Sequence, residues 1–380
     1  MNVLVAIDSF KGSLSSQEAS RAVCCGILDV FPDSEVTCIP IADGGEGTTE
    51  ALIPSLGGRF IEKTVVGPLG TSVSAKYGWV PEQHLAVIEV ASAAGLAMVP
   101  EEQRNPMYTT TFGFGELIAD ALDRGCKRII LGLGGSATND CGIGMLQALG
   151  YRFLDESGTP VGCCGKDVAF IRTIDDNNIH PKLHQCLFEV ASDVNNPLCG
   201  PSGATAIYAP QKGATPAMIQ EMDAAFAGFA QIAANKTGGD CQSIPGTGAA
   251  GGLGFALMTF LKANIQSGIS LIMDTLRFSE YVKDADIVLT GEGRLDGQTT
   301  MGKVPVGVAQ YAKNYGKPVV ALAGCITPDA ISCNNFGIDA FFPIIDRPCT
   351  EAEAMDTKTA AANLRRTASQ VVRLISIDAL

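Results

Sequence analysis

The sequence predicts an α/β protein of two domains, and three observations support this fold class. Near the N-terminus, short apolar runs alternate with helix-like segments, as in parallel sheets whose strands are connected by helices. Residues 59–90 hold short apolar segments separated by Gly-Pro and Pro turns, with no helix-length segment between them. The C-terminal third returns to the first pattern. At 380 residues, the chain is long enough for two domains of roughly 100–200 residues each.

The N-terminal segment begins with a predicted buried strand at residues 3–7. Ser15 and Glu18 have the spacing of a capping box, which predicts a helix running to about residue 30. A second strand is predicted at residues 36–41, followed by a glycine-rich loop and a further helix. Since each strand is followed by a helix, we expect parallel strands with helices packed on the sheet.

The middle of the chain begins as a predicted antiparallel meander, because its first apolar segments are short and separated only by turns. The strands of this meander are expected at residues 60–66, 72–79 and 84–90. A helix at residues 114–124 and a strand at residues 128–133 follow.

The C-terminal third again alternates strands and helices. Strands are predicted at residues 286–290, 319–323 and 340–344, and helices at residues 306–315 and 351–375. The simplest topology therefore joins the two ends of the chain into one parallel sheet.

We expect a discontinuous parallel-sheet α/β domain of the Rossmann or flavodoxin type, formed by residues 1–64 and 275–380. Residues 65–274 would form an inserted domain with a mixed sheet. Ligands of open α/β sheets bind beyond the carboxyl ends of the strands. We therefore expect candidate site residues in the loops that follow the strands.

Composition excludes several classes of function. The chain has 40 acidic and 27 basic side chains, a net charge of −13, which argues against binding to nucleic acid or to an anionic membrane surface. No apolar run approaches the roughly 20 residues that span a bilayer. The N-terminal apolar run is too short for a secretion signal. A small anionic substrate remains possible, because a few local cations can overrule the global field.

Cysteine and histidine usage indicates a cytoplasmic protein without a zinc site. The 13 cysteines are irregularly spaced and include no Cys-x-x-Cys pair, which is typical of reduced thiols. His180 and His184 have zinc-ligand spacing, but Pro181 stands where a zinc protease helix carries its glutamate.

Polar, glycine-rich loops follow the first two predicted strands. The first loop carries Ser9, Lys11 and Gly12 at a helix start, where a carboxylate or phosphate could bind. The second carries Asp43 and Glu46, which could orient a hydroxylated substrate or bind magnesium through water. Each loop could also be an ordinary helix start.

A third loop follows the strand predicted at residues 128–133. Gly134, Gly135, Ser136 and Thr138 offer consecutive N–H groups and hydroxyls, which is the composition of an anion-binding nest. Lys212 is an isolated lysine in a later loop and could add a positive charge.

A fourth loop follows the strand predicted at residues 286–290. Glu292, Arg294 and Asp296 alternate there with small or flexible residues, which suits a clamp for a phosphoryl or carboxylate group. The next residues match the spacing of a phosphate-binding Walker A loop as far as Lys303. Val304 replaces the Ser or Thr that binds magnesium, so we exclude that motif.

Two further segments are candidates. Asp193 follows an apolar run and could act as a general base or a metal ligand. Residues 246–251 match the glycine fingerprint of dinucleotide-binding loops, but no convincing strand precedes them. We interpret this segment, with Gly248, as a loop that contacts phosphate before a helix.

Taken in order, these blocks resemble the bacterial glycerate kinase family nearly from end to end. The resemblance implies a two-domain α/β fold without an ordinary Walker A loop. It also implies ATP- and Mg²⁺-dependent phosphorylation of D-glycerate at its 2-hydroxyl, in a cleft between the domains. The blocks that carry the resemblance are residues 9–13, 43–48, 134–140, 192–194, 211–214, 246–252 and 290–297.

Chemistry assigns the expected roles. Lys11 and Arg294 would hold the carboxylate of glycerate, and Asp193 or Asp296 would accept the hydroxyl proton or bind Mg²⁺. The remaining substrate contacts would come from Ser9, Gly12, Asp43 and Glu46, and the ATP contacts from Gly134, Gly135, Ser136, Thr138, Lys212, Gly248 and Glu292.

Two alternatives stay open at this point. The glycine fingerprint would suit an NAD-dependent dehydrogenase of a small hydroxy acid. A sensor that binds a sugar acid or a nucleotide without turning it over is a third class, although binding alone needs fewer carboxylates. The sequence does not indicate an oligomeric state.

Overall fold

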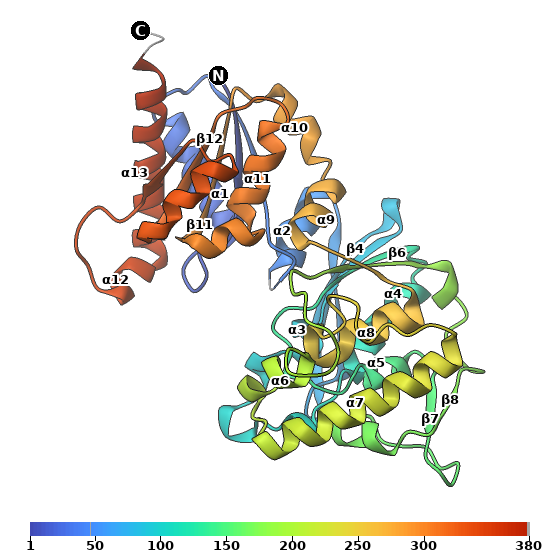
Figure 1. The fold of residues 1–380 in the computed structure, drawn as a ribbon. Helices are drawn as coiled ribbons and strands as arrows, with labels where there is room; N and C mark the ends of the chain where they lie inside the picture. Colours follow the sequence, from blue (N-terminus) through green and yellow to red (C-terminus); the bar gives the residue numbers. More distant parts are fainter. Residues whose placement is uncertain (46, 378–380) are drawn as a thin grey trace. The chain divides into compact units, whose positions relative to one another are not determined.

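The computed structural model describes residues 1–45 and 47–377, which fold as two compact units. Unit 1 contains the described residues of 1–43, 50–56 and 269–380, and unit 2 those of 44–49 and 57–268 (Figure 1). Both ends of the chain thus belong to unit 1. The domain limits expected from the sequence, at residues 64 and 274, and the cleft between the domains stay predictions.

Unit 1 is built on a five-stranded, fully parallel sheet, as predicted. Numbered by their order along the chain, its strands lie in the order 2-1-3-4-5, which is the flavodoxin-like arrangement. The direction in which successive strands are added reverses between β1 and β11. The strands are β1 (Asn2–Ile7), β2 (Glu35–Pro40), β11 (Ile287–Leu295), β12 (Val319–Ile326) and β13 (Ala340–Pro343).

Helices cover both faces of this sheet. Val3, Val5 and Ile7 of β1 pack into an apolar cluster with α1 and α13, which lie side by side (Figure 1). The alternate residues Leu4 and Ala6 are buried on the other face, where α10 and α11 contact β1. The helices are α1 (Ser16–Leu28), α9 (Gly268–Thr275), α10 (Phe278–Asp284), α11 (Val304–Lys313), α12 (Glu351–Met355) and α13 (Thr357–Ile375).

The local start signal of α1 is confirmed. The Ser15 side chain accepts a hydrogen bond from the Glu18 N–H, and the Glu18 side chain accepts one from the Ser15 N–H. The single helix predicted at residues 351–375 is wrong, because α12 ends at Met355 and α13 begins at Thr357. Asp356 interrupts the pattern by accepting the Thr359 N–H at 2.9 Å as the N-cap of α13.

The fourth predicted loop is largely strand. β11 continues to Leu295, so Glu292 and Arg294 lie on the strand itself, and Arg294 pairs with Cys325 of β12. Gly291, one of the glycines that suggested a loop, is needed for close packing: a Cβ there would lie 2.1 Å from the carbonyl oxygen of Leu322.

Unit 2 is built on a six-stranded mixed sheet in the order β10-β9-β6-β5-β4-β3. The pairs β3–β4 and β4–β5 are antiparallel, which confirms the predicted meander, and the other pairs are parallel. Its strands are β3 (Arg59–Val66), β4 (Ser72–Val80), β5 (Leu85–Glu89), β6 (Arg128–Gly132), β9 (Leu187–Ala191) and β10 (Asn264–Gln266).

The helices of unit 2 enclose one large apolar core with this sheet. A small antiparallel pair, β7 (Arg152–Leu154) and β8 (Thr173–Asp175), lies outside the main sheet. The helices are α3 (Ala91–Ala94), α4 (Phe112–Asp123), α5 (Ile143–Ala148), α6 (Ala204–Tyr208), α7 (Pro216–Thr237) and α8 (Ala249–Leu261), while α2 (Thr48–Ser55) runs from unit 2 into unit 1.

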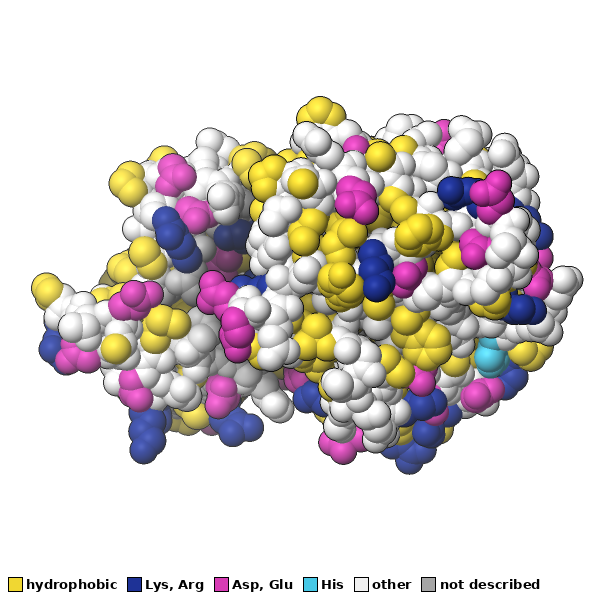
Figure 2. All heavy atoms as spheres, turned by 90° about the horizontal axis from the view of Figure 1, so that it is seen from below, with side chains coloured by type: hydrophobic (Ala, Val, Ile, Leu, Met, Phe, Trp, Pro, Cys, Tyr) yellow, Lys and Arg dark blue, Asp and Glu magenta, His cyan; other side chains and the backbone are white. Residues whose placement is uncertain are grey.

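The surface carries charges of both signs. On the face drawn in Figure 2, Lys and Arg side chains lie scattered among Asp and Glu. Among the helices of the described residues, none has both the length and the apolar character that a membrane crossing requires.

Helix α4 approaches α5 closely at Gly115. A Cβ at this position would lie 2.4 Å from the carbonyl oxygen of Met145 and 2.7 Å from the Cβ of Ala148. Gly228 in α7 offers a matched contrast, because a Cβ there would meet nothing within 4 Å.

We expect Gly115→Ala to lower the free energy of unfolding by about 1–3 kcal/mol, since the added methyl group forces α4 away from α5. Gly228→Ala should raise the free energy of unfolding by up to about 1 kcal/mol, because alanine is the better helix former. Urea unfolding of both variants checks this. Equal effects of the two substitutions would contradict the close approach at Gly115.

Candidate functional site

A cavity of about 740 Å³ lies at the carboxyl edge of the unit 1 sheet. Residues from the loop after β1, from the ends of β11 and β12, and from the segment after β13 line it. It therefore lies at the point where the strand order reverses, which is where open α/β sheets bind ligands. Its polar and charged lining includes Asp8, Ser9, Lys11, Asp43, Glu292, Arg294, Lys303 and Arg347.

The structure brings together the candidates that the sequence placed in unit 1. Lys11 Nζ lies 3.7 Å from Asp43 Oδ2. Arg294 Nε lies 3.2 Å from Asp296 Oδ2. Glu292 and Arg294 are two residues apart on β11, so their side chains leave the same face of the strand and enter one cavity.

Glu292 is the buried centre of the β11 side of this cavity. Its Oε1 accepts a hydrogen bond from Thr299 Oγ1 at 2.6 Å, and its Oε2 lies 3.5 Å from Lys303 Nζ. Burial raises the pKa of Glu292, while Thr299 and Lys303 oppose that shift. Lys303 also lies 3.7 Å from Asp296 Oδ1, so it serves an ion cluster rather than a Walker A loop.

Asp8 is a site residue that the sequence prediction did not single out. It directly follows β1, and its N–H donates to the Gly291 carbonyl of β11 at 3.0 Å. Its side chain is only 7% exposed, and Oδ1 accepts the Ser9 N–H at 2.6 Å. Burial and the nearby Asp43 raise the pKa of Asp8 to about 7, against the opposing effect of Lys11. Its position as the first carboxylate after a buried strand was the available signal.

The other substrate candidates have simpler surroundings. Gly12 has a φ of 78°, and a Cβ there would lie 2.6 Å from Met355 Cε, so glycine is required at this turn. Ser9 is partly buried beside Asp8. Glu46 lies outside the described residues.

In unit 2, the loop after β6 holds the predicted anion nest. Gly134 and Gly135 are exposed, and Gly135 adopts a φ of 74°, the left-handed conformation that turns successive N–H groups toward one side. Ser136 is anchored by an isolated bridge to Gly95. Thr138 is fully buried, and its Oγ1 has no hydrogen-bond partner among the described residues.

Lys212 lies behind this loop rather than in front of it. It is 2% exposed, and its Nζ donates to Ser136 Oγ at 2.9 Å and to the Thr138 carbonyl at 2.6 Å. Burial lowers the pKa of Lys212 to about 7, while Asp140 opposes the shift. The lysine therefore holds the loop in shape.

Asp140, which the sequence prediction did not single out, fixes the far end of the same loop. Its Oδ2 accepts the N–H and the hydroxyl of Thr111, both at 2.7 Å, and its Oδ1 accepts the Gly142 N–H at 3.0 Å. Burial raises the pKa of Asp140, and these hydrogen bonds lower it. An acidic residue directly after a glycine-serine loop was a weak signal, because such residues often only cap a helix.

The remaining two candidates of unit 2 also make local contacts. Asp193 is exposed after β9, and its Oδ1 accepts the Gly268 N–H at 3.1 Å. The N–H of Gly248 donates to the Asn196 carbonyl at 2.9 Å, and a Cβ there would lie 2.3 Å from the Pro197 carbonyl oxygen. Gly248 therefore permits close packing of two backbone segments.

The dehydrogenase alternative finds no support. The element before residues 246–251 in the described chain is helix α7, whereas the dinucleotide fingerprint requires a strand there. Part of its glycine pattern serves internal packing, since a Cβ at Gly251 would lie 2.2 Å from the Thr138 carbonyl oxygen.

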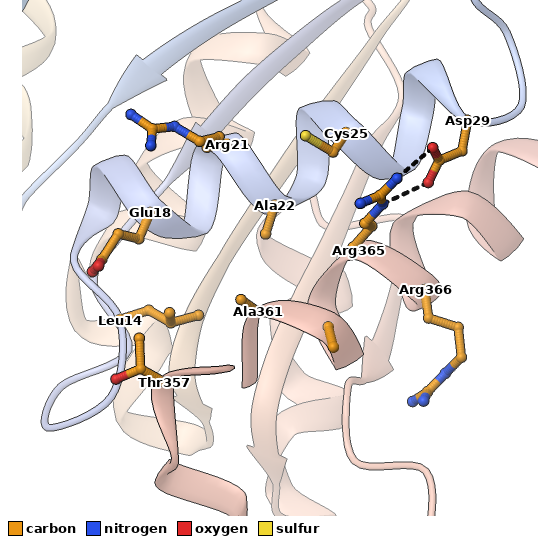
Figure 3. Close-up of a pocket in the computed structure, with 11 residues that line it drawn as sticks. Leu14, Glu18, Arg21, Ala22, Cys25, Asp29, Thr357, Ala361, Arg365 and Arg366 are labelled. Carbon is orange, nitrogen blue, oxygen red and sulfur yellow. Dashed lines mark hydrogen bonds and ion pairs between the residues drawn. The ribbon is translucent and has the colours of Figure 1, made fainter. Parts of the chain in front are cut away.

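A second hollow of unit 1, about 530 Å³ in volume, lies between α1 and α13 (Figure 3). Arg365 turns toward Asp29 there and makes two hydrogen bonds of 2.6 Å to its carboxylate. None of the candidate residues lines this hollow. Within the described residues, no group of three or more His, Cys, Asp or Glu side chains is arranged to hold a metal.

The buried Lys212 predicts a pH dependence of stability. The unfolded chain keeps the lysine protonated up to about pH 10.4, whereas the folded chain releases that proton near pH 7. Stability therefore rises with pH across this window, by at most about 1.4 kcal/mol per pH unit. Relative to Lys212→Met, the wild type should gain free energy of unfolding between pH 7 and 10, measured in urea. Lys236→Met, an exposed lysine of unit 2, is the control, and parallel curves for wild type and Lys212→Met would contradict the shift.

Comparison with known proteins shows which family the chain belongs to. The sequence profile of the glycerate kinase family matches residues 3–376. The chain is 47% identical to a glycerate kinase of Haemophilus influenzae over 99% of both chains. It is 43% identical to glycerate 2-kinase of Escherichia coli K12, over 99% of this chain and 98% of that one. A crystal structure from Salmonella typhimurium LT2, of a protein provisionally named glycerate kinase 2, superposes with a TM-score of 0.90 at 44% identity and covers 99% of this chain and 98% of its own. The chain therefore belongs to the glycerate kinase family.

Proposed function

We propose that this protein transfers the γ-phosphoryl group of ATP to the 2-hydroxyl of D-glycerate, giving 2-phosphoglycerate and ADP. The observation that carries the proposal is the unit 1 cavity, in which cations and buried carboxylates meet at the reversal point of a parallel sheet. The position of transfer is supported by the relative from E. coli, which is named a glycerate 2-kinase.

Lys11 and Arg294 are the proposed ligands of the glycerate carboxylate. Both line the cavity, and both side chains are more than half exposed, so a small anion can reach them. Arginine suits this role because its guanidinium matches the two oxygens of a carboxylate. Ser9, Gly12 and Asp43 would contact the rest of the substrate, together with Glu46.

The nest of unit 2 is the proposed site of the ATP phosphates. The exposed Gly134 and Gly135 would let a phosphate approach the backbone closely, while the buried Ser136 supports the loop by accepting a hydrogen bond from Lys212. Lys212 and Asp140 would act through this loop, since hydrogen bonds from behind keep its N–H groups in place. Glu292 would contribute to ATP binding indirectly, by holding Lys303 in place. Gly248 would contribute by allowing two backbone segments to pack closely.

A magnesium ion would neutralise phosphate charge during transfer. Proteins hold Mg²⁺ with one or two carboxylates and with phosphate oxygens, so a cluster of three acidic residues is not required. The exposed carboxylate of Asp193 fits such a role. Asp296 fits it less well, because Arg294, Lys303 and the Gln298 N–H already surround its oxygens.

We also propose a cytoplasmic location, as expected from the sequence. It is supported by the thiols of the 13 cysteines, all of which are unpaired, because a reducing compartment keeps cysteines in this form.

The direct test is an assay of ADP release with ATP, Mg²⁺ and a panel of three-carbon hydroxy acids. We expect D-glycerate to be the preferred acceptor, and phosphorus NMR of the product to show the phosphate on the secondary carbon. Phosphate on the primary carbon would overturn the 2-position, and glycerate binding without ADP release would favour the sensor alternative.

Substitution of the two cations tests the substrate site. Each of Lys11→Met and Arg294→Met removes a charge-assisted hydrogen bond worth about 1.5–3 kcal/mol, so kcat/KM for glycerate should fall roughly 10- to 150-fold. The KM for ATP should change little. Arg373→Met, an exposed arginine near the end of α13, is the matched control. A larger effect on the KM for ATP than on that for glycerate would reassign the cavity to the nucleotide.

A further inference from the structure

We propose that Asp8 is the catalytic base that accepts the hydroxyl proton of the acceptor substrate. The inference rests on the proposed function and adds a residue with a stated role to it. It is carried by the position of one buried carboxylate in the unit 1 cavity.

The backbone and one side-chain oxygen of Asp8 are fixed. Its N–H is bound to the Gly291 carbonyl of β11, and Oδ1 accepts the Ser9 N–H, so the carboxylate is held where the pairing of β1 with β11 ends. Among the described residues, no hydrogen bond or ion pair engages Oδ2. Asp8 lines the cavity, so this second oxygen is the one that can receive a proton from a bound hydroxyl.

The charges around Asp8 suit a base that works near neutral pH. Asp43 after β2 and Glu292 on β11 are its acidic neighbours, and Lys11 in its own loop is the basic one. Arg294 and Lys303 line the same cavity but lie against Asp296 and Glu292. Burial, and after it the charge of Asp43, raises the pKa of Asp8 to about 7, and a base is most effective when its pKa is close to the working pH.

The carboxylates of β11 and of the residue that follows it are already engaged. Asp296 lies against Arg294 and Lys303, and its Oδ1 accepts the Gln298 N–H. Glu292 accepts a hydrogen bond from Thr299 and lies beside Lys303. Donors of the protein thus occupy these two carboxylates, whereas Asp8 has a single backbone donor on Oδ1.

The volume of the cavity also allows the step. About 740 Å³ exceeds the need of a three-carbon acid, so the terminal phosphoryl group of the donor can enter beside it. As the hydroxyl oxygen of glycerate bonds to the γ-phosphorus, the bond from that phosphorus to the bridging oxygen of ATP breaks. The hydroxyl proton moves to Oδ2 of Asp8, ADP leaves with the electron pair of the broken bond, and Asp8 returns its proton to solvent.

The test is Asp8→Asn, which keeps an oxygen to accept the Ser9 N–H and removes the base. We expect kcat to fall by roughly 10²–10⁴-fold, the scale of general acid–base catalysis. In the wild type, kcat/KM for glycerate should fall tenfold per pH unit below about pH 7, because protonated Asp8 cannot act. This acid limb should be absent from the residual activity of Asp8→Asn. Asp29 is a carboxylate in the hollow between α1 and α13, and Asp29→Asn is the matched control. This variant should keep both the kcat of the wild type and the fall of its activity below pH 7.

The outcomes separate this inference from the proposed function. If the wild type phosphorylates no glycerate, the proposed function fails whatever Asp8 does. If the wild type is active and Asp8→Asn keeps its turnover or its acid limb, the role of Asp8 is overturned alone. A limb that disappears in Asp193→Asn or Asp296→Asn but persists in Asp8→Asn would move the role to that residue. Circular dichroism shows whether Asp8→Asn folds. If it does not fold, the pH dependence of kcat/KM is measured on Asp8→Glu instead, in which the base is displaced by one methylene group.

Discussion

Parallel strands bring their carboxyl ends to one edge of a sheet, and the unit 1 cavity depends on this constraint. Asp8 follows β1, Glu292 lies near the end of β11, and Asp43 follows β2, so residues far apart in the chain share one cavity. Between β1 and β11 the connections turn to opposite sides, which leaves the edge open there. The chemistry of the cavity therefore follows from the strand order and from the polar residue that comes after each strand.

The two units treat buried charge in different ways. In unit 2, Asp140 is fully buried and accepts several hydrogen bonds, and Lys212 donates to two oxygens of the same loop. Satisfied in this way, both groups stiffen the loop that presents the glycines. Burial shifts the pKa of all three groups, but Asp8 in unit 1 has only one bound oxygen, which leaves the other able to receive a proton.

The sequence predicts what depends on local pattern. The alternation of strands and helices, the capping box at Ser15 and the meander could all be identified, because hydrophobic periodicity and capping residues act over a few positions. The extension of β11 was missed since Gly291 reads as a turn signal, whereas its real function is close packing on Leu322. The same ambiguity applies to Gly248: its phosphate contact stays a prediction, and in the structure its N–H donates to Asn196. A glycine in a sequence indicates a close approach to the backbone, but it does not indicate whether a ligand or another part of the protein makes that approach.

The raised pKa of Asp8 could not be predicted from the sequence, for a different reason. Its pKa depends on burial and on Asp43, and neither the depth of the loop nor the closeness of the two carboxylates is written in a single segment. Between about pH 4 and 7, folded Asp8 keeps a proton that the unfolded chain releases, so folding stability falls as the pH rises through this window. A fold optimised only for stability would place a cation or a further donor at its second oxygen. That unfavourable arrangement is what one expects where a carboxylate serves a reaction and the rest of the sheet supplies the stability.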